Sequence, residues 1–192
     1  MRAFIAIQCP EGLKGNIMEF QKKIESIGKL KTVERENIHM TLKFLGDVDE
    51  DKTDEIIRIL DSIAKDDKNR KFKINLFGAG VFPNLDYIKV VWVGVSDGSG
   101  EILSLQQQID EKLAPLKFKK EKDFHPHFTV ARVKFLSPQE KKELRQVLSE
   151  NSKTDFVEFE FKSFELMKSE LTREGPIYSI VKTKVSHFNL IC

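Results

Sequence analysis

Cysteine is scarce in this sequence: only Cys9 and Cys192 occur, near opposite ends of a chain of 192 residues. Neither lies in a CxxC pair or at a spacing typical of zinc ligands, which argues against a disulfide framework and against a cysteine-based metal site. We therefore expect free thiols in a reducing compartment, and hence a cytoplasmic protein.

Long apolar runs and an excess of one charge are also missing. No stretch approaches the roughly 18 apolar residues that a membrane-spanning helix needs, and the apolar segment 3–7 is too short for a signal peptide. The net charge of +2 at pH 7 gives no overall indication of nucleic-acid binding, although a local basic cleft is compatible with it. With 40% hydrophobic residues the chain can bury a substantial core, so we predict a single domain over 1–192.

Two of the four histidines open the same short pattern, His39-Met40-Thr41-Leu42 and His127-Phe128-Thr129-Val130. Random placement of four histidines and seven threonines would give about 0.15 such His-x-Thr pair. Because side chains alternate between the two faces of a strand, each His and Thr point to one side and the apolar residues point into a core. Each tetrapeptide thus predicts a strand that offers an imidazole and a hydroxyl to a cleft.

The order of the predicted elements repeats around these two patterns. Each half runs strand, helix, motif strand, helix and two further strands, and the two motif histidines are 88 residues apart. A helix follows each motif at a comparable offset, near Asp51 and from Ser137, where a capping box is expected. The glycine-containing segment 78–86 is expected to be a loop. We therefore expect an internal duplication, in which two intertwined lobes are related by a pseudo-two-fold axis. Such an axis would bring the two His-Thr pairs together in one cleft.

A pair of imidazoles near neutral pH can hold one neutral base and one protonated acid. This suits in-line attack at a phosphate without a metal, with the hydroxyls of Thr41 and Thr129 donating to the nonbridging oxygens. Lys43 has the strand parity to face the same cleft as Thr41, so we expect it to bind the substrate phosphate. Arg132 has the opposite parity to Thr129, so it needs a bulge to join the site.

Other residues near the motifs invite functional interpretations that we weigh against simpler ones. His125 and His127 with His39 could suggest a metal site, but Pro126 intervenes and no carboxylate or thiol stands at ligand spacing. Phe4 and Phe82 are candidates for stacking on a nucleobase. The segment 119–122 (KKEK) is expected to be a solvated face, with an RNA-backbone contact as the alternative.

Three segments together resemble the 2H phosphoesterase superfamily: 2–7 (RAFIAI), 39–48 (HMTLKFLGDV) and 126–132 (PHFTVAR). Within it they are most similar to the RNA 2′,3′-cyclic phosphodiesterases, formerly called 2′-5′ RNA ligases. The resemblance implies a bilobal α+β fold, with two antiparallel sheets around a central cleft and helices packed outside. It also implies catalysis by His39 and His127 with no cofactor, and carries Arg132 over to phosphate or nucleotide binding.

The activity implied by this resemblance is hydrolysis of a terminal 2′,3′-cyclic phosphate to a 2′-phosphomonoester. By that analogy His39 protonates the departing 3′ oxygen and His127 activates water. The partner is then RNA with such an end, or a small cyclic nucleotide, and a monomer is expected. Two alternatives stay open: a 2′-5′ RNA ligase, which runs the same chemistry in reverse, and a nucleotide- or RNA-binding module without turnover.

Overall fold

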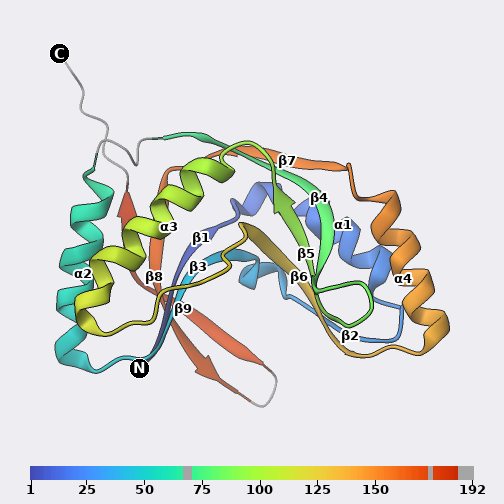
Figure 1. Ribbon diagram of the computed structural model, residues 1–192, viewed down its shortest axis with the longest axis horizontal. Coiled ribbons are helices and arrows are strands. Elements are labelled where there is room, and N and C mark those ends of the chain that lie inside the picture. Colours follow the sequence, from blue (N-terminus) through green and yellow to red (C-terminus); the bar gives the residue numbers. More distant parts are fainter. Residues whose placement is uncertain (67–70, 173–174, 186–192) are drawn as a thin grey trace.

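Two antiparallel sheets form the framework of this computed structural model, which describes residues 1–66, 71–172 and 175–185 (Figure 1). The four-stranded sheet has the order β3 (His39–Asp47), β1 (Arg2–Gln8), β8 (Ser163–Leu171) and β9 (Pro176–Val185). The five-stranded sheet has the order β2 (Lys29–Thr32), β6 (His127–Phe135), β5 (Ile88–Val95), β4 (Lys73–Pro83) and β7 (Asp155–Glu160). All neighbouring strands in both sheets pair antiparallel.

The helices cover the outer faces of the two sheets (Figure 1). The helices α2 (Glu50–Ala64) and α3 (Ser99–Leu113) pack together on the four-stranded sheet, whereas α1 (Gly15–Ile24) and α4 (Pro138–Glu150) pack on the five-stranded sheet. The chain passes from one sheet to the other several times, so neither sheet is a continuous segment of sequence. The predicted α+β class, with two antiparallel sheets and helices outside, is confirmed.

The main hydrophobic core lies between the sheets and their helices. It includes the inward residues of both motif strands, among them Met40, Leu42, Phe128 and Val130. A second, small apolar cluster of Phe4, Ala6 and Met167 lies on the opposite face of the four-stranded sheet. The alternation of β1 and β3 therefore separates a core face from a face that carries the motif side chains.

Local sequence signals explain several element boundaries. Ser137 caps α4 as predicted: its Oγ accepts a hydrogen bond from Glu140 N at 3.3 Å, and Glu140 Oε2 accepts one from Ser137 N at 2.6 Å. No helix in the described part of the chain is both long and apolar enough to span a membrane.

The expectation that 78–86 is a loop is wrong for 78–83, because β4 continues to Pro83, and only 84–86 belong to the connection to β5. The glycines in this segment serve close packing rather than a turn. The Trp92 ring on β5 lies across Gly80, and a Cβ at Gly80 would come within 2.3 Å of that ring. A glycine inside a strand can mark such a close approach.

Candidate active site

The two motif strands present their histidines and threonines in the same way. On β3, His39 and Thr41 lie opposite Gln8 and Ala6 of β1, while Met40 points into the core. On β6, His127 and Thr129 lie opposite Gly94 and Trp92 of β5, while Phe128 points into the core. The sequence periodicity and the strand register agree at both motifs.

Each histidine ring is oriented by a backbone carbonyl two residues earlier. His39 Nδ1 lies 2.7 Å from Asn37 O, and His127 Nδ1 lies 2.6 Å from His125 O. Since a carbonyl can only accept, the proton of each neutral ring resides on Nδ1, which leaves Nε2 unprotonated. His39 Nε2 then accepts a hydrogen bond from the Thr41 hydroxyl at 3.1 Å.

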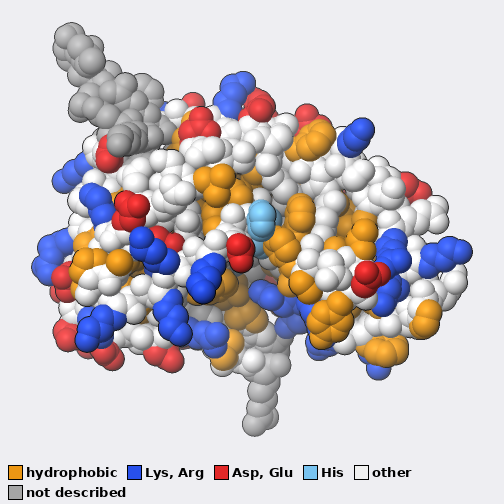
Figure 2. Space-filling view, in the orientation of Figure 1, with side chains coloured by type: hydrophobic (Ala, Val, Ile, Leu, Met, Phe, Trp, Pro, Cys, Tyr) orange, Lys and Arg blue, Asp and Glu red, His pale blue; other side chains and the backbone are white. Residues whose placement is uncertain are grey.

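The two motifs converge because β3 and β6 contact each other where the two sheets meet (Figure 1). Burial is the main cause that lowers the pKa of His39 to about 4, and the charges of Arg132 and His127 lower it further. Burial raises the pKa of Tyr178 on β9, and the charge of Arg132 opposes that rise. The guanidinium of Arg132 therefore lies close enough to both motif histidines to act on their charge. Figure 2 shows histidine surface near the middle of this face, with hydrophobic side chains around it.

The environment favours the neutral form of both imidazoles. The pKa of His127 is also lowered, first by burial and then by the charges of His125 and Arg132. Neutral rings with a free or hydroxyl-bonded Nε2 are suited to accept protons. An anion bound beside them would favour the protonated form of one ring, so substrate binding itself can prepare the acid.

Aromatic rings flank each histidine. The Phe82 ring meets the His127 ring edge-on at 4.9 Å, and the Tyr178 ring meets the His39 ring edge-on at 5.3 Å. Phe4 also lies 5.0 Å from His39, but it is only 4% exposed, so the expectation that it stacks on a base is wrong. The sequence did not predict Tyr178 as a site residue. Its local pattern does not indicate that β9 pairs with β8 beside this site.

A cavity of about 170 Å³ adjoins His39. Its walls come from all four strands of the four-stranded sheet and from the turn before β3. Its lining residues are Gln8, Glu36, Asn37, His39, Met167, Tyr178 and Ile180. The mixed polar and apolar lining suits a small organic group next to the imidazole.

Two β-bulges decide the positions of the predicted cations. On β6 the register skips Val130, since Trp92 pairs with Thr129 and Val91 with Ala131. This bulge turns Arg132 onto the face of His127 and Thr129, as its predicted role requires.

The corresponding bulge on β3 has the opposite effect on Lys43. Ala6 pairs with Thr41 and Ile5 with Lys43, so Lys43 turns into the core. Its side chain is fully buried and forms an ion pair with Asp110 of α3. The expectation that Lys43 binds the substrate phosphate is therefore wrong, because the bulge reverses the strand parity on which it was based.

The remaining candidates take structural positions. His125 supplies its carbonyl to His127, and among the described residues no three His, Cys, Asp or Glu side chains are grouped as metal ligands. Cys9 is buried, which raises the pKa of its thiol to about 11. Cys192 and His187 lie outside the described residues.

Comparisons with known proteins give a consistent result. The family model of the 2′-5′ RNA ligase superfamily matches residues 17–173. A protein of Methanocaldococcus jannaschii named RNA 2′,3′-cyclic phosphodiesterase is 43% identical over 182 residues, with 95% of this chain and 99% of that protein covered. A protein of the same name from Aquifex aeolicus is 34% identical, with 95% of each chain covered.

Solved structures support the same fold. A protein of Thermus thermophilus matches with a TM-score of 0.82 at 25% identity, and 97% of this chain and 98% of that chain are covered. E. coli LigT complexed with 3′-AMP matches with a TM-score of 0.75 at 23% identity, and 96% and 97% of the two chains are covered.

Proposed function

The chain belongs to the 2′-5′ RNA ligase superfamily, and on this basis we propose that it hydrolyses RNA 2′,3′-cyclic phosphate ends to 2′-phosphomonoesters. Relatives named RNA 2′,3′-cyclic phosphodiesterase, at 34–43% identity over most of the chain, support this activity. The single observation that carries the mechanism is the paired arrangement of His39 and His127. Each donates from Nδ1 to a carbonyl and keeps Nε2 for proton transfer.

In the proposed reaction, His127 Nε2 takes a proton from water as the water oxygen attacks phosphorus. The bond from phosphorus to the 3′ oxygen breaks, and His39 Nε2–H gives its proton to that oxygen. The product carries a 2′-phosphate and a 3′-hydroxyl. His39 ends neutral and His127 ends protonated, and exchange with solvent restores the starting forms. No metal or cofactor enters these steps.

Substrate binding also supplies the proton of the acid. The cyclic phosphodiester carries a negative charge, which raises the pKa of His39 from its low value. When Nε2 gains a proton it can no longer accept from Thr41, so the Thr41 hydroxyl is released to donate to a nonbridging oxygen. Thr129 and Arg132, on the other motif strand β6, bind the same phosphate in this proposal.

The test is hydrolysis of an oligoribonucleotide with a 2′,3′-cyclic phosphate end, in EDTA, by wild type, His39→Ala and His127→Ala. We expect a 2′-phosphate product from wild type and a loss of activity of at least about 100-fold in each variant. Thr183→Val, an exposed change on β9, is the matched control and should retain activity. Circular dichroism confirms folding.

Wild-type activity in either histidine variant would overturn the mechanism. A 3′-phosphate product would mean that the bond from phosphorus to the 2′ oxygen breaks instead of the bond to the 3′ oxygen. Addition of an RNA with a 5′-hydroxyl to the same assay detects ligation, which shares the transition state. We also propose a monomer as the working form, and the scarcity of cysteine supports a cytoplasmic location. Light scattering tests the monomer and cell fractionation the location.

A further inference from the structure

A second, larger groove lies beside the proposed active site. It has a volume of about 460 Å³ and is formed by the end of β3 and the segment that follows α3, with the lining residues Phe44, Leu45, Gly46 and 117–121. The proposed reaction uses none of these residues.

The groove is continuous with the catalytic face of β3 through Phe44. Phe44 pairs with Phe4, which lies on the His39 side of the sheet, and its own ring is 64% exposed. It stands three residues beyond Thr41, or about 10 Å along the strand. A polymer bound at Thr41 can therefore reach this ring, and an exposed aromatic ring suits stacking on a base.

The opposite wall of the groove is positively charged. The segment 117–122 has a net charge of +3, because it contains four lysines (Lys117, Lys119, Lys120 and Lys122) and one carboxylate, Glu121. Lys117, Lys119 and Lys120 are exposed, and none of them forms an ion pair with a carboxylate in the parts of the chain that the structure describes. Unneutralised lysines beside an aromatic ring complement a chain of phosphates.

The core fixes the backbone of this segment. Lys43 Nζ donates a hydrogen bond to Lys119 O at 2.6 Å, and its partner Asp110 accepts one from Glu121 N at 2.9 Å. Gln106 Nε2 donates to the same Asp110 carboxylate at 2.8 Å. The buried pair thus binds the segment by its main chain and leaves the lysine side chains free to point outward.

Lys117 occupies a backbone conformation that does not favour lysine. Its φ is +66°, which makes it the one non-glycine residue with a positive φ in the described part of the chain. Such a conformation is unfavourable for an L-residue with a side chain, whereas glycine adopts it freely. Its N–H donates to Ala114 O at 2.9 Å, so Lys117 closes the turn that follows α3.

We propose that this groove binds the sugar–phosphate backbone of single-stranded RNA upstream of its 2′,3′-cyclic end, with Phe44 stacking on a base. The inference rests on the proposed function and deepens it: the preferred substrate is an RNA chain rather than a mononucleotide. Lys43 and Asp110 are positioning residues, because they act on RNA only through the segment that they hold.

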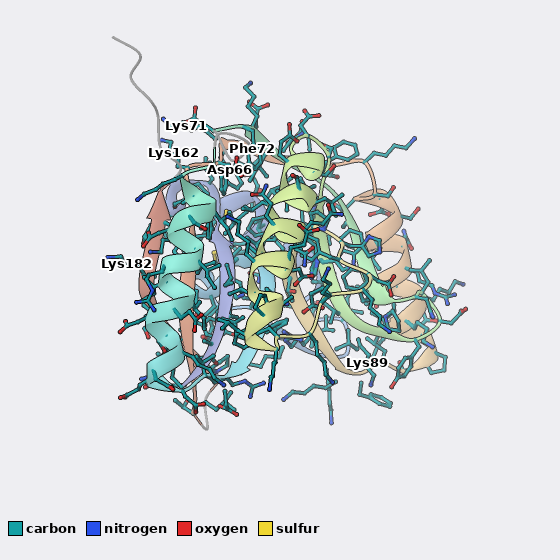
Figure 3. All side chains as sticks on the ribbon, turned by 60° about the vertical axis from the view of Figure 1, so that its left-hand side comes forward. Asp66, Lys71, Phe72, Lys89, Lys162 and Lys182 are labelled. Atoms are coloured by element: carbon teal, nitrogen blue, oxygen red, sulfur yellow. The ribbon has the colours of Figure 1, made fainter. Side chains whose placement is uncertain are left out.

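The test compares two substrates, a cytidine 2′,3′-cyclic phosphate and an octaribonucleotide with the same end, over a range of salt concentrations. The groove variant is Lys117→Gly/Lys119→Ala/Lys120→Ala. The matched control is Lys142→Ala/Lys162→Ala/Lys182→Ala, which removes three exposed lysines elsewhere. Figure 3 shows Lys162 and Lys182 at the rim beside α2, away from the end of α3.

We expect the groove variant to lose about tenfold or more in kcat/KM on the octaribonucleotide and to keep wild-type kcat/KM on the mononucleotide. The dependence of log(kcat/KM) on log salt should become shallower by about 2, since each phosphate contact on a single strand contributes about 0.7. The control variant should match wild type on both substrates.

The outcomes separate this inference from the proposed function. If wild type hydrolyses neither substrate, the proposed function fails. If wild type hydrolyses both and the groove variant equals the control on the octaribonucleotide, the groove does not bind RNA and the inference fails. An equal loss on both substrates also overturns it, because the lysines would then act on the terminal nucleotide or on folding.

Discussion

Phe44 and Arg132 occupy equivalent positions in the two halves of the molecule. Each stands five residues after its motif histidine and follows a β-bulge, at which the register skips one residue. Both side chains are exposed on the face that carries the histidines, while their neighbours Lys43 and Ala131 are buried. The pseudo-symmetric framework therefore offers an aromatic ring on one side of the site and a cation on the other.

This difference predicts separable effects on the two substrates. Arg132→Met should lower kcat/KM roughly 10- to 100-fold on both the mononucleotide and the octaribonucleotide, because a hydrogen bond to a charged group contributes about 1.5–3 kcal/mol. Phe44→Ala should lower kcat/KM on the octaribonucleotide only. Steady-state kinetics measures both effects. If Arg132→Met lowered kcat/KM on the octaribonucleotide alone, the guanidinium would not bind the terminal phosphate.

Arg132 should also act on the histidines directly. Its charge is one of the causes that lower the pKa of His39 and of His127, after burial. In Arg132→Met the pKa of both should rise, which NMR titration of the imidazole Cε1 protons measures. The substitution Lys134→Met on the same strand is the control, since Lys134 is not among the charges that act on either ring. Unchanged titration in Arg132→Met would contradict the proposed proximity.

The sequence revealed the motifs but not the bulges. Strand periodicity correctly placed His39 and Thr41 on one face, because that rule holds as long as the register is regular. One extra residue reverses the rule for everything that follows, so Lys43 was wrongly assigned to the cleft. Tyr178 and the segment 117–121 reach the site through tertiary structure, which local patterns do not encode. The fold class, in contrast, follows from the apolar periodicity of strands and helices along the whole chain and could be predicted.

The two motif hydroxyls should contribute separately to catalysis. Thr41→Val and Thr129→Val each remove a donor aimed at the developing negative charge, and the loss of such a donor lowers kcat by about 10²–10³. Thr183→Val on β9 makes the same change at an exposed strand position and should retain wild-type kcat. Rapid-quench kinetics with saturating substrate measures the chemical step. A change in KM alone would mean that the hydroxyls bind ground state and transition state equally.

The buried pair of Lys43 and Asp110 predicts a strongly asymmetric mutational response. Lys43→Met leaves the Asp110 carboxylate buried without its cation, which should lower the free energy of unfolding by about 3–5 kcal/mol. The double variant Lys43→Met/Asp110→Leu removes both charges and should recover much of this loss. Urea unfolding of wild type, Lys43→Met, Asp110→Leu and the double variant forms a complete cycle.

Lys184 is the matched control for this cycle. It is as deeply buried as Lys43, but its partner Asp61 is 48% exposed and can be solvated when the lysine is removed. Lys184→Met should therefore destabilise the protein less than Lys43→Met does. Equal losses would show that the cost comes from packing of the lysine stem and not from an unpaired buried carboxylate.

The low pKa of His39 predicts that stability falls in mild acid. The folded protein holds this ring neutral down to about pH 4, whereas in the unfolded chain it takes up a proton near pH 6.5. Above pH 6.5 neither state is protonated, so the ring contributes no pH dependence. Between pH 6.5 and pH 4 only the unfolded state binds the proton, so the free energy of unfolding decreases as the pH falls. At pH 4.5 the decrease amounts to about 2–3 kcal/mol.

Since carboxylates also titrate in this range, the effect of His39 must be isolated by comparison with a variant. In His39→Asn the amide can still donate to Asn37 O, but the titrating ring is gone. The stability of His39→Asn relative to wild type should therefore improve by about 2–3 kcal/mol between pH 7.5 and pH 4.5, measured by urea unfolding at each pH. Met40→Leu on the same strand does not titrate and should show no such change. If His39→Asn and wild type lose stability in parallel, the ring is protonated in the folded protein and its site is more accessible to water than its burial implies.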